Sequence, residues 1–204
     1  MQKEEISPEE ERFMQACRFG KIDLAKELYL LGNVSIQKRN NYAFRYSCEN
    51  GHLDIAKWLH SLNNINIHAQ DDYAFRYSCF NSHLNVAKWL YSLGDIDIHV
   101  INDLTFMLVC GKKSNLHIVK YLLSLDYIDI TKDRHFAFRI ACENNCLDIV
   151  LLLCSMNNNY KFQTDGNKIV KWCYNNGNGN TWKTHIESQY LIDIMLNERR
   201  YIIS

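Results

Sequence analysis

The chain has 204 residues, of which 47% are hydrophobic and 23% charged, a composition typical of a domain that buries an apolar core. Lysine plus arginine and aspartate plus glutamate number 23 each, so no net charge draws the chain to nucleic acid or an anionic membrane. No run of about 20 apolar residues is present to span a bilayer, and the N-terminal MQKEEISPEEE is acidic rather than apolar. We therefore expect a cytoplasmic protein that binds neither nucleic acid nor membrane.

The first predicted element is a helix near the N-terminus. Ser7 is a suitable N-cap, Pro8 suits the first helical position, and Glu10 completes a capping box three residues after the serine. The helix continues through Phe13 to Cys17, where a pattern begins that the rest of the chain repeats.

Cysteine recurs at a nearly fixed spacing along the chain. It stands at positions 17, 48, 79, 110, 142 and 173, which are separated by 31, 31, 31, 32 and 31 residues. Phenylalanine precedes each of the first five by four residues, Ile169 takes that place before the sixth, and the heptapeptide YAFRYSC occurs at both 42–48 and 73–79. This register predicts a solenoid of six units, each of which buries its apolar face against its neighbours.

Each unit is predicted to contain two helices and a finger. In the second unit, 44–50 has the apolar spacing of a short helix that ends at Gly51, and 53–62 has the spacing of a second helix. The alternation of polar and apolar residues at 64–67 predicts an extended stem that leads to a turn at 70–72.

The period also sets the predicted boundaries. The outer repeats should be caps that turn one face to water, and the stretch 157–181, rich in asparagine and glycine, marks a change near the C-terminus. A capping box at Thr184–Glu187 predicts one closing helix. We expect a single solenoid of an N-terminal cap, four central repeats and a degenerate C-terminal cap, at residues 1–41, 42–72, 73–103, 104–135, 136–167 and 168–204.

These residues resemble the ankyrin repeat. The segment 50–57, NGHLDIAK, is similar to the start of the family's second helix, 63–67 is similar to its GADVN segment, and 73–76 takes the place of its TPLH motif. The resemblance covers about residues 13–173 and implies an all-α solenoid of helix-turn-helix units with short hairpin-like fingers, which binds proteins through its concave face. The wording AFRxxCENGHLDIAKWL resembles ankyrin proteins of giant amoeba-infecting viruses such as mimiviruses, whose site of action would be the host cell cytoplasm.

The sequence departs from the family pattern in its first helices. The threonine, proline and histidine of TPLH are absent, and arginine stands in place of the histidine at positions 45, 76 and 139. The hydrogen bonding of the loops is therefore left open. Two ion pairs at i, i+4 spacing are expected, Arg45–Glu49 and Arg139–Glu143.

The sequence has no pattern typical of catalysis. Serine-histidine-aspartate triads, HExxH and phosphate-binding glycine loops are all missing, so we expect no enzyme and no cofactor. The cysteine column is expected to be structural, because zinc ligands lie about 2.3 Å from the metal whereas packed helices lie about 8–10 Å apart. Cys142, Cys146 and Cys154 leave a metal or thiol module open as a hypothesis, although no four-ligand spacing accompanies them.

Partner binding is expected at positions that differ between otherwise identical units. Glu49 follows the first YAFRYSC and Phe80 the second, and the third fingertip carries Val100 and Ile101 where the second is polar. With Met107, these apolar residues are predicted to form the centre of a binding face; the alternative is that they pack on the next finger. The candidate residues are Tyr46, Glu49, Arg76, Tyr77, Phe80, Asn81, Val100, Ile101, Met107 and Lys112.

The expected function is therefore protein binding by a monomeric ankyrin stack, with a host factor as partner if the chain is viral. The alternative is an adaptor that links a captured protein to a ubiquitin ligase through its C-terminal segment. Residues 182–204 are the only candidate for that segment, and they are short for a three-helix element of the F-box kind.

Overall fold

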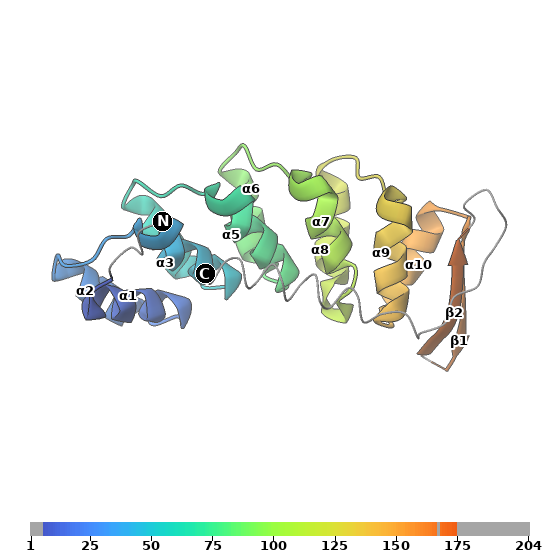
Figure 1. The fold of residues 1–204 in the computed structure, drawn as a ribbon, viewed down its shortest axis with the longest axis horizontal. Coiled ribbons are helices and arrows are strands. Elements are labelled where there is room, and N and C mark those ends of the chain that lie inside the picture. The colour runs from blue at the N-terminus through green and yellow to red at the C-terminus, as the bar shows by residue number, and fades with distance from the viewer. Residues whose placement is uncertain (1–5, 167, 175–204) are drawn as a thin grey trace. The chain divides into compact units, whose positions relative to one another are not determined.

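A computed structural model describes residues 6–166 and 168–174, which form short helices, connecting loops and one hairpin (Figure 1). The chain divides into two compact units, residues 1–105 and 106–204, and α7 runs across their boundary. The elements in chain order are α1 (Pro8–Arg18), α2 (Ile22–Leu30), α3 (Lys38–Glu49), α4 (Leu53–Ser61), α5 (Ala69–Phe80), α6 (Leu84–Ser92), α7 (Val100–Val109), the 3-10 turn η1 (Lys113–Asn115), α8 (Leu116–Leu125), α9 (Lys132–Glu143), α10 (Leu147–Met156), β1 (Tyr160–Asp165) and β2 (Lys168–Tyr174).

The predicted N-terminal capping box is confirmed. The backbone N–H of Glu10 donates to the Ser7 hydroxyl at 3.1 Å, and the backbone N–H of Ser7 donates back to the Glu10 carboxylate at 3.1 Å. Pro8 occupies the first turn, where its missing N–H has no helical partner to lose. Helix α1 therefore begins where the sequence places it.

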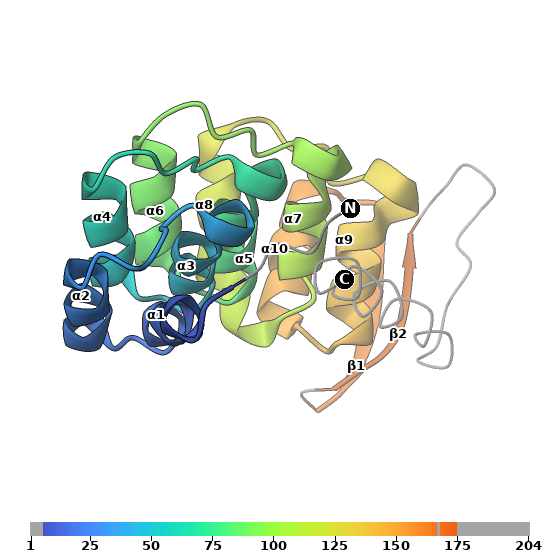
Figure 2. The same ribbon diagram turned by 60° about the vertical axis from the view of Figure 1, so that its left-hand side comes forward.

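The first unit is built from stacked pairs of helices. Helices α1, α3 and α5 pack in a row, and each also packs against the helix that follows it, as α1–α2, α3–α4 and α5–α6 (Figures 1 and 2). The predicted core columns are confirmed, because the phenylalanines and cysteines of this row are no more than 1% exposed: Phe13, Cys17, Phe44, Cys48, Phe75 and Cys79.

Glycine is required where α3 ends. Gly51 has a φ of +81°, and a Cβ at that position would lie 2.6 Å from Nδ1 of His83 in the next repeat. Gly20 and His52 repeat this arrangement one unit earlier, with a Cβ placed 2.6 Å from the ring. The histidine of one repeat thus occupies the space left by the glycine of the repeat before.

The finger stem is an extended segment stabilised by local hydrogen bonds. The backbone N–H of His68 donates to the Asn66 side chain at 3.0 Å, and that of His99 donates to Asp97 at 2.8 Å. These Asx turns account for the polar positions of the predicted alternation. The predicted turn at 70–72 is confirmed, since Gln70, Asp71 and Asp72 have φ values of 57°, 54° and 55°.

Arginine resolves the loop hydrogen bonding that the sequence left open. In the second repeat, Arg45 donates from Nε to the Asn40 carbonyl at 2.8 Å and from Nη2 to the Arg39 carbonyl at 3.0 Å. Arg76 does the same in the third repeat, to the carbonyls of Asp71 at 2.7 Å and Gln70 at 3.2 Å. Each arginine therefore closes its own left-handed fingertip.

The predicted ion pair between Arg45 and Glu49 is wrong. The Arg45 side chain is directed to the fingertip carbonyls, and the Glu49 carboxylate accepts instead from the hydroxyl of Tyr73 at 2.6 Å. The spacing alone favoured the pair, but carbonyls with no helical donor compete for the guanidinium.

The second unit continues the core columns and ends in a hairpin. Phe106, Cys110, Phe138 and Cys142 are no more than 1% exposed, α10 packs on α9, and β2 packs on α9 as well. Strand β1 pairs antiparallel with β2, with Phe162 opposite Trp172 and an irregularity between Gln163 and Thr164.

Strands replace the helix that the cysteine register predicts around Ile169 and Cys173. Alternating side chains flank Asp165-Gly166, and Gly166 has a φ of +55°, a conformation suited to a tight hairpin turn. Tyr160, Ile169 and Trp172 are buried, so the hairpin covers apolar surface in place of a sixth helix pair. The closing helix predicted from Thr184 lies outside the described residues.

Candidate functional site

The first unit presents one face on which large side chains recur at helical spacing. On α3 these are Tyr42, Tyr46 and Glu49, at i, i+4 and i+7, and the same positions of α5 hold Tyr73, Tyr77 and Phe80. We call this surface the first-helix face, and we include Arg18 at the end of α1. Most of these side chains are half-buried, whereas Tyr73 is only 3% exposed.

The rings on this face form a continuous series, which we call the tyrosine ladder. Tyr42 stacks on Tyr46 with ring centres 4.0 Å apart, and Tyr73 stacks on Tyr77 at 4.1 Å. Tyr46 meets Tyr73 across the repeat boundary at 5.9 Å, and Tyr77 meets Phe80 edge to face at 6.3 Å. Aromatic contacts therefore link the two repeats along their first helices.

Guanidinium groups lie over the ladder. The Arg18 guanidinium is 5.2 Å from the centre of the Tyr46 ring, and that of Arg45 is 4.7 Å from the centre of the Tyr73 ring. Arg76 lies 5.8 Å from the Tyr77 ring centre. These cation–π contacts hold the arginines in the same layer as the rings.

In the first two repeats, the residue that follows the core cysteine contacts the next repeat. Arg18 Nη1 donates to the Tyr42 hydroxyl at 3.4 Å, and Glu49 accepts from the Tyr73 hydroxyl at 2.6 Å, so both contacts span 24 residues. Phe80 occupies the third position of this column, and the residue 24 places after it is Leu104. The column therefore changes from basic to acidic to aromatic along the first unit.

Burial dominates the ionisation of these groups. It raises the pKa of Tyr73 far above its ordinary value, and the neighbouring Glu49 carboxylate raises that pKa further. Burial also raises the pKa of Tyr42, although Arg18 lowers it in part. Burial lowers the pKa of Arg45, and the nearby tyrosines oppose that change. The Tyr42 and Tyr73 phenols are therefore neutral at neutral pH.

The predicted site residues at positions 46–81 lie on or beside this face. Tyr46, Arg76, Tyr77 and Phe80 are half-buried. Asn81 donates to the Glu49 backbone carbonyl at 3.0 Å and so ties α5 to α3.

The remaining predicted site residues are placed differently. Val100 is half-buried at the start of α7, and the side chain of Ile101 lies outside the described part of the structure. Met107 and Lys112 belong to the second unit. Met107 is 4% exposed, so the expectation that it faces solvent is wrong; its position in α7 is an inward one beside Phe106.

Sequence reasoning missed three residues of the face: Tyr42, Tyr73 and Arg18. The two tyrosines are identical in both repeats, and a search for variable positions passes over them. Arg18 could have been found, because it stands in the same column as Glu49 and Phe80, one place after a core cysteine.

The cysteines of the repeat column are buried thiols that stay protonated at neutral pH. Burial raises the pKa of Cys17 to about 12 and raises those of Cys48, Cys79, Cys110 and Cys142 further. A thiol that stays protonated at neutral pH is a poor nucleophile and a poor metal ligand. Within the described residues, no group of three or more histidine, cysteine, aspartate or glutamate side chains is arranged to hold a metal ion.

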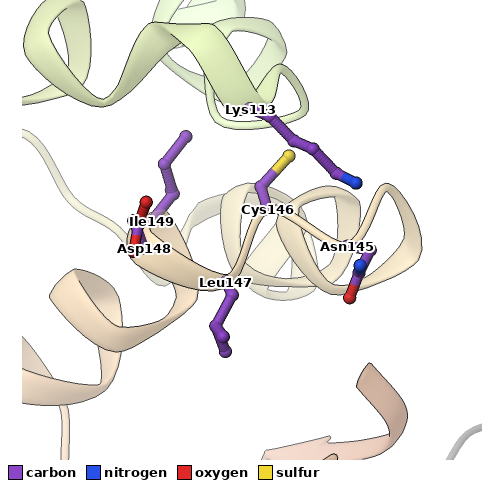
Figure 3. A pocket seen from close by; sticks show the side chains of 6 residues that line it. All are labelled: Lys113, Asn145, Cys146, Leu147, Asp148 and Ile149. Atoms are coloured by element: carbon purple, nitrogen blue, oxygen red, sulfur yellow. The ribbon is translucent and has the colours of Figure 1, made fainter. Parts of the chain in front are cut away.

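The second unit contains a pocket of about 360 Å³ at the start of α10. Figure 3 shows the Cys146 side chain turned toward Lys113, with Leu147 pointing away on the other side of the backbone. Burial raises the pKa of Cys146 to about 11, although Lys113 acts to lower it. The pocket therefore holds a protonated thiol rather than a reactive thiolate.

Two further hypotheses concern other parts of the chain. Burial raises the pKa of Cys154 to about 11, so it offers no thiolate beside Cys142 and Cys146 at neutral pH. Residues 182–204, the candidate adaptor segment, lie outside the described residues.

Among the helices that the structure describes, none combines the length and the apolar character needed to cross a lipid bilayer.

Comparison with known proteins identifies the repeats of the first unit. No curated protein matches the chain. Residues 13–102 match the family model described as ankyrin repeats (3 copies). This segment coincides with helix pairs α1–α2, α3–α4 and α5–α6 and their fingers. Residues 13–102 are therefore a run of ankyrin repeats, and their stacked helix pairs have the ankyrin-repeat fold.

Proposed function

We propose that the chain is a protein-interaction module that binds its partner on the first-helix face. Ankyrin repeats are generally protein–protein interaction modules and are typically not catalytic. The first helices of an ankyrin stack line its concave face, which makes the tyrosine ladder the natural contact surface. We propose that the chain acts there as a monomer.

The tyrosine ladder with its arginines is the observation that carries this proposal. Tyrosine and arginine are enriched at the energetic centres of protein interfaces, because they combine large contact area with polar ends. Here Tyr42, Tyr46, Tyr77 and Phe80 are half-buried and held in fixed positions by stacking. A face that is already ordered costs little conformational entropy when a partner binds.

Phe80 is the most informative position to test. It is the aromatic member of the variable column, by which we mean the residues that follow the core cysteines: Arg18, Glu49 and Phe80. We expect Phe80→Asp to weaken capture of a specific partner by about tenfold or more, since a charge would enter the centre of the interface. The matched control is Leu30→Asp, an apolar-to-aspartate change at a side chain that is 82% exposed on α2. Leu30→Asp should capture the partner as the unaltered chain does.

Affinity capture from cell lysate followed by mass spectrometry provides the measurement. A partner is assigned to the face only if Phe80→Asp loses it, Leu30→Asp keeps it, and both variants melt at the temperature of the unaltered chain. Loss of folding in Phe80→Asp would support the alternative that Phe80 is a packing residue. In that event Tyr46→Ser tests the same face from α3.

Two narrower hypotheses rest on the sequence. The resemblance of AFRxxCENGHLDIAKWL to ankyrin proteins of giant amoeba-infecting viruses favours a host protein as the partner, which capture from amoebal lysate would test. The ubiquitin-ligase adaptor hypothesis requires residues 182–204 to recruit ligase subunits, and the same capture reveals whether those subunits are present.

A further inference from the structure

The first-helix face presents hydrogen-bond donors with few acceptors to match them. Arg18 gives one N–H to the Tyr42 hydroxyl, which leaves that phenol its own hydrogen to donate. The Tyr46 hydroxyl makes no hydrogen bond within the described part of the chain, and its ring is half-buried between those of Tyr42 and Tyr73. Arginine contributes only donors.

The carboxylates of this region are already engaged. Glu49 accepts from the Tyr73 hydroxyl at 2.6 Å, and Glu11, on the same side of α1 as Arg18, accepts from the Gln15 side chain at 2.7 Å. Arg45 is 3% exposed and donates to backbone carbonyls rather than to a carboxylate. Among the described residues no carboxylate forms a salt bridge with Arg45, although the charge of Glu49 favours its protonated form.

A polynucleotide is a poorer match than a peptide for this surface. Proteins that bind single strands offer ring faces on which bases stack. The ring faces of the ladder are instead turned to one another and to the guanidinium groups of Arg18 and Arg45. The chain also has equal numbers of acidic and basic residues, so it lacks the excess charge on which phosphate binding depends.

We propose that the first-helix face selects a protein segment in which carboxylate side chains accompany apolar ones. Carboxylates accept hydrogen bonds without donating any, which complements a surface of phenols and guanidinium groups. In the proposed complex, the carboxylates of the partner segment contact Arg18, and its apolar side chains contact Phe80. This inference rests on the proposed function, since it names the chemistry of the partner at the same face.

Selection from a displayed library of random peptides on the immobilised full chain tests this inference. Aspartate and glutamate should be enriched together with apolar residues among the peptides recovered. The peptide recovered most often is then synthesised with and without its acidic residues changed to the corresponding amides. We expect the amide form to bind about tenfold more weakly in fluorescence anisotropy, because charged hydrogen bonds are lost.

The matching protein variants are Arg18→Gln, Arg18→Lys and Lys57→Gln. Arg18→Gln should weaken the acidic peptide about tenfold and leave its amide form unaffected. Arg18→Lys should restore much of the binding, because it retains the charge. Lys57→Gln removes a charge from an exposed position on α4 and should change nothing.

Several outcomes would overturn the inference. Recovered peptides that are basic or neutral would do so, as would equal binding of the acidic and amide forms. Tighter binding of an oligothymidylate than of the acidic peptide would also contradict it. If binding is lost in Phe80→Asp but shows no acidic preference, the proposed face stands and only this inference fails. Peptides that bind Phe80→Asp normally, or a selection that recovers none, would count against both.

Discussion

The repeats at 42–72 and 73–103 begin with the same seven residues and build the same local structure. Ser47 donates to the Phe44 carbonyl at 2.8 Å, and Ser78 donates to the Phe75 carbonyl at 2.8 Å. The arginine of each repeat closes its fingertip, and the two tyrosines of each first helix stack. Within each repeat, the identical residues thus make the same local contacts, whereas their contacts to neighbouring repeats differ: Tyr42 accepts from Arg18, and Tyr73 donates to Glu49.

The two repeats differ at the first position after that shared stretch. Glu49 binds a hydroxyl of the following repeat, whereas Phe80 packs on Tyr77 of its own helix. The corresponding residues of the following repeats differ to match: Tyr73 supplies a hydroxyl for Glu49, and Leu104 has none to offer a carboxylate at position 80. The two repeats therefore share the structure built by the heptapeptide. The chemistry of the first-helix face is set by the residue that follows it, Glu49 or Phe80.

The largest expected effect on the free energy of unfolding comes from removing a buried phenylalanine ring. This change tests whether the repeats at 42–72 and 73–103 are packed equivalently. Phe44 and Phe75 are at most 1% exposed, and each has an aromatic neighbour with ring centres 6.3 Å apart, Trp89 and Tyr91 respectively. We expect Phe44→Ala and Phe75→Ala each to reduce the free energy of unfolding by about 3–5 kcal/mol. Urea unfolding measures both.

Equal costs would confirm that the repeats share one packing arrangement. Costs that differ by more than about 1.5 kcal/mol, the worth of an aromatic pair, would show that the neighbours matter more than the shared heptapeptide. The double variant Phe44→Ala with Trp89→Ala separates the ring contact from the burial of the phenylalanine.

The next effect concerns the junction between repeats, where Gly51 faces His83. Gly32→Ala is the matched control: its φ is +77° and no atom lies within 4 Å of the added Cβ. It should cost about 1–2 kcal/mol from backbone strain alone. Gly51→Ala adds a collision with the His83 ring at 2.6 Å and should cost about 1–3 kcal/mol more than the control.

Removing the obstructing ring tests the cause of that difference. In a His83→Ala background, Gly51→Ala should cost no more than Gly32→Ala does. If Gly51→Ala and Gly32→Ala were equally destabilising in the unaltered chain, the histidine would not constrain the junction. Thermal unfolding of the four variants decides between these outcomes.

The fold of the first unit could be predicted from the sequence because its signals are redundant. Phe44 and Cys48 recur at the same period in every repeat of the unit, and Gly51 recurs at Gly20, so helix, core and helix end support one another. The capping box at Ser7 and the turn at Gln70 rest on local chemistry and were equally accessible.

Other features depend on competition between partners, which a sequence pattern does not rank. Arg45 could bind Glu49 or the fingertip carbonyls, and its partner is settled only when the fingertip adopts its left-handed turn. Met107 stands where the second repeat has Arg45, and both side chains are buried, at 4% and 3% exposure, so the position is an inward one in both repeats. At the C-terminus, the cysteine register predicts a helix at Ile169, but the chain forms the β1–β2 hairpin instead.

The smallest expected effect on stability is at Glu49. It tests whether the negative charge of Glu49 strengthens the hydrogen bond that it accepts from Tyr73. Glu49→Gln replaces a charged acceptor for the Tyr73 hydroxyl with a neutral one. Hydrogen bonds to charged groups contribute about 1.5–3 kcal/mol and neutral ones about 0.5–1.5 kcal/mol, so the variant should lose about 1 kcal/mol at neutral pH. Glu27→Gln, at an exposed carboxylate on α2, is the control and should be neutral.

Alkaline titration identifies the bond itself. Burial and then Glu49 raise the pKa of Tyr73 in the folded chain above the ordinary value of 10.0. A raised folded pKa contributes stability that is complete below pH 10 and is lost as pH rises toward the folded value, because the unfolded chain loses its proton first. Glu49→Gln removes the charge that is the largest cause after burial, so ultraviolet absorption should show the Tyr73 phenolate forming at lower pH than in the unaltered chain. The stability advantage of the unaltered chain should then shrink once pH exceeds the lowered pKa. An unchanged Tyr73 titration would show that the carboxylate at position 49 does not govern this hydroxyl.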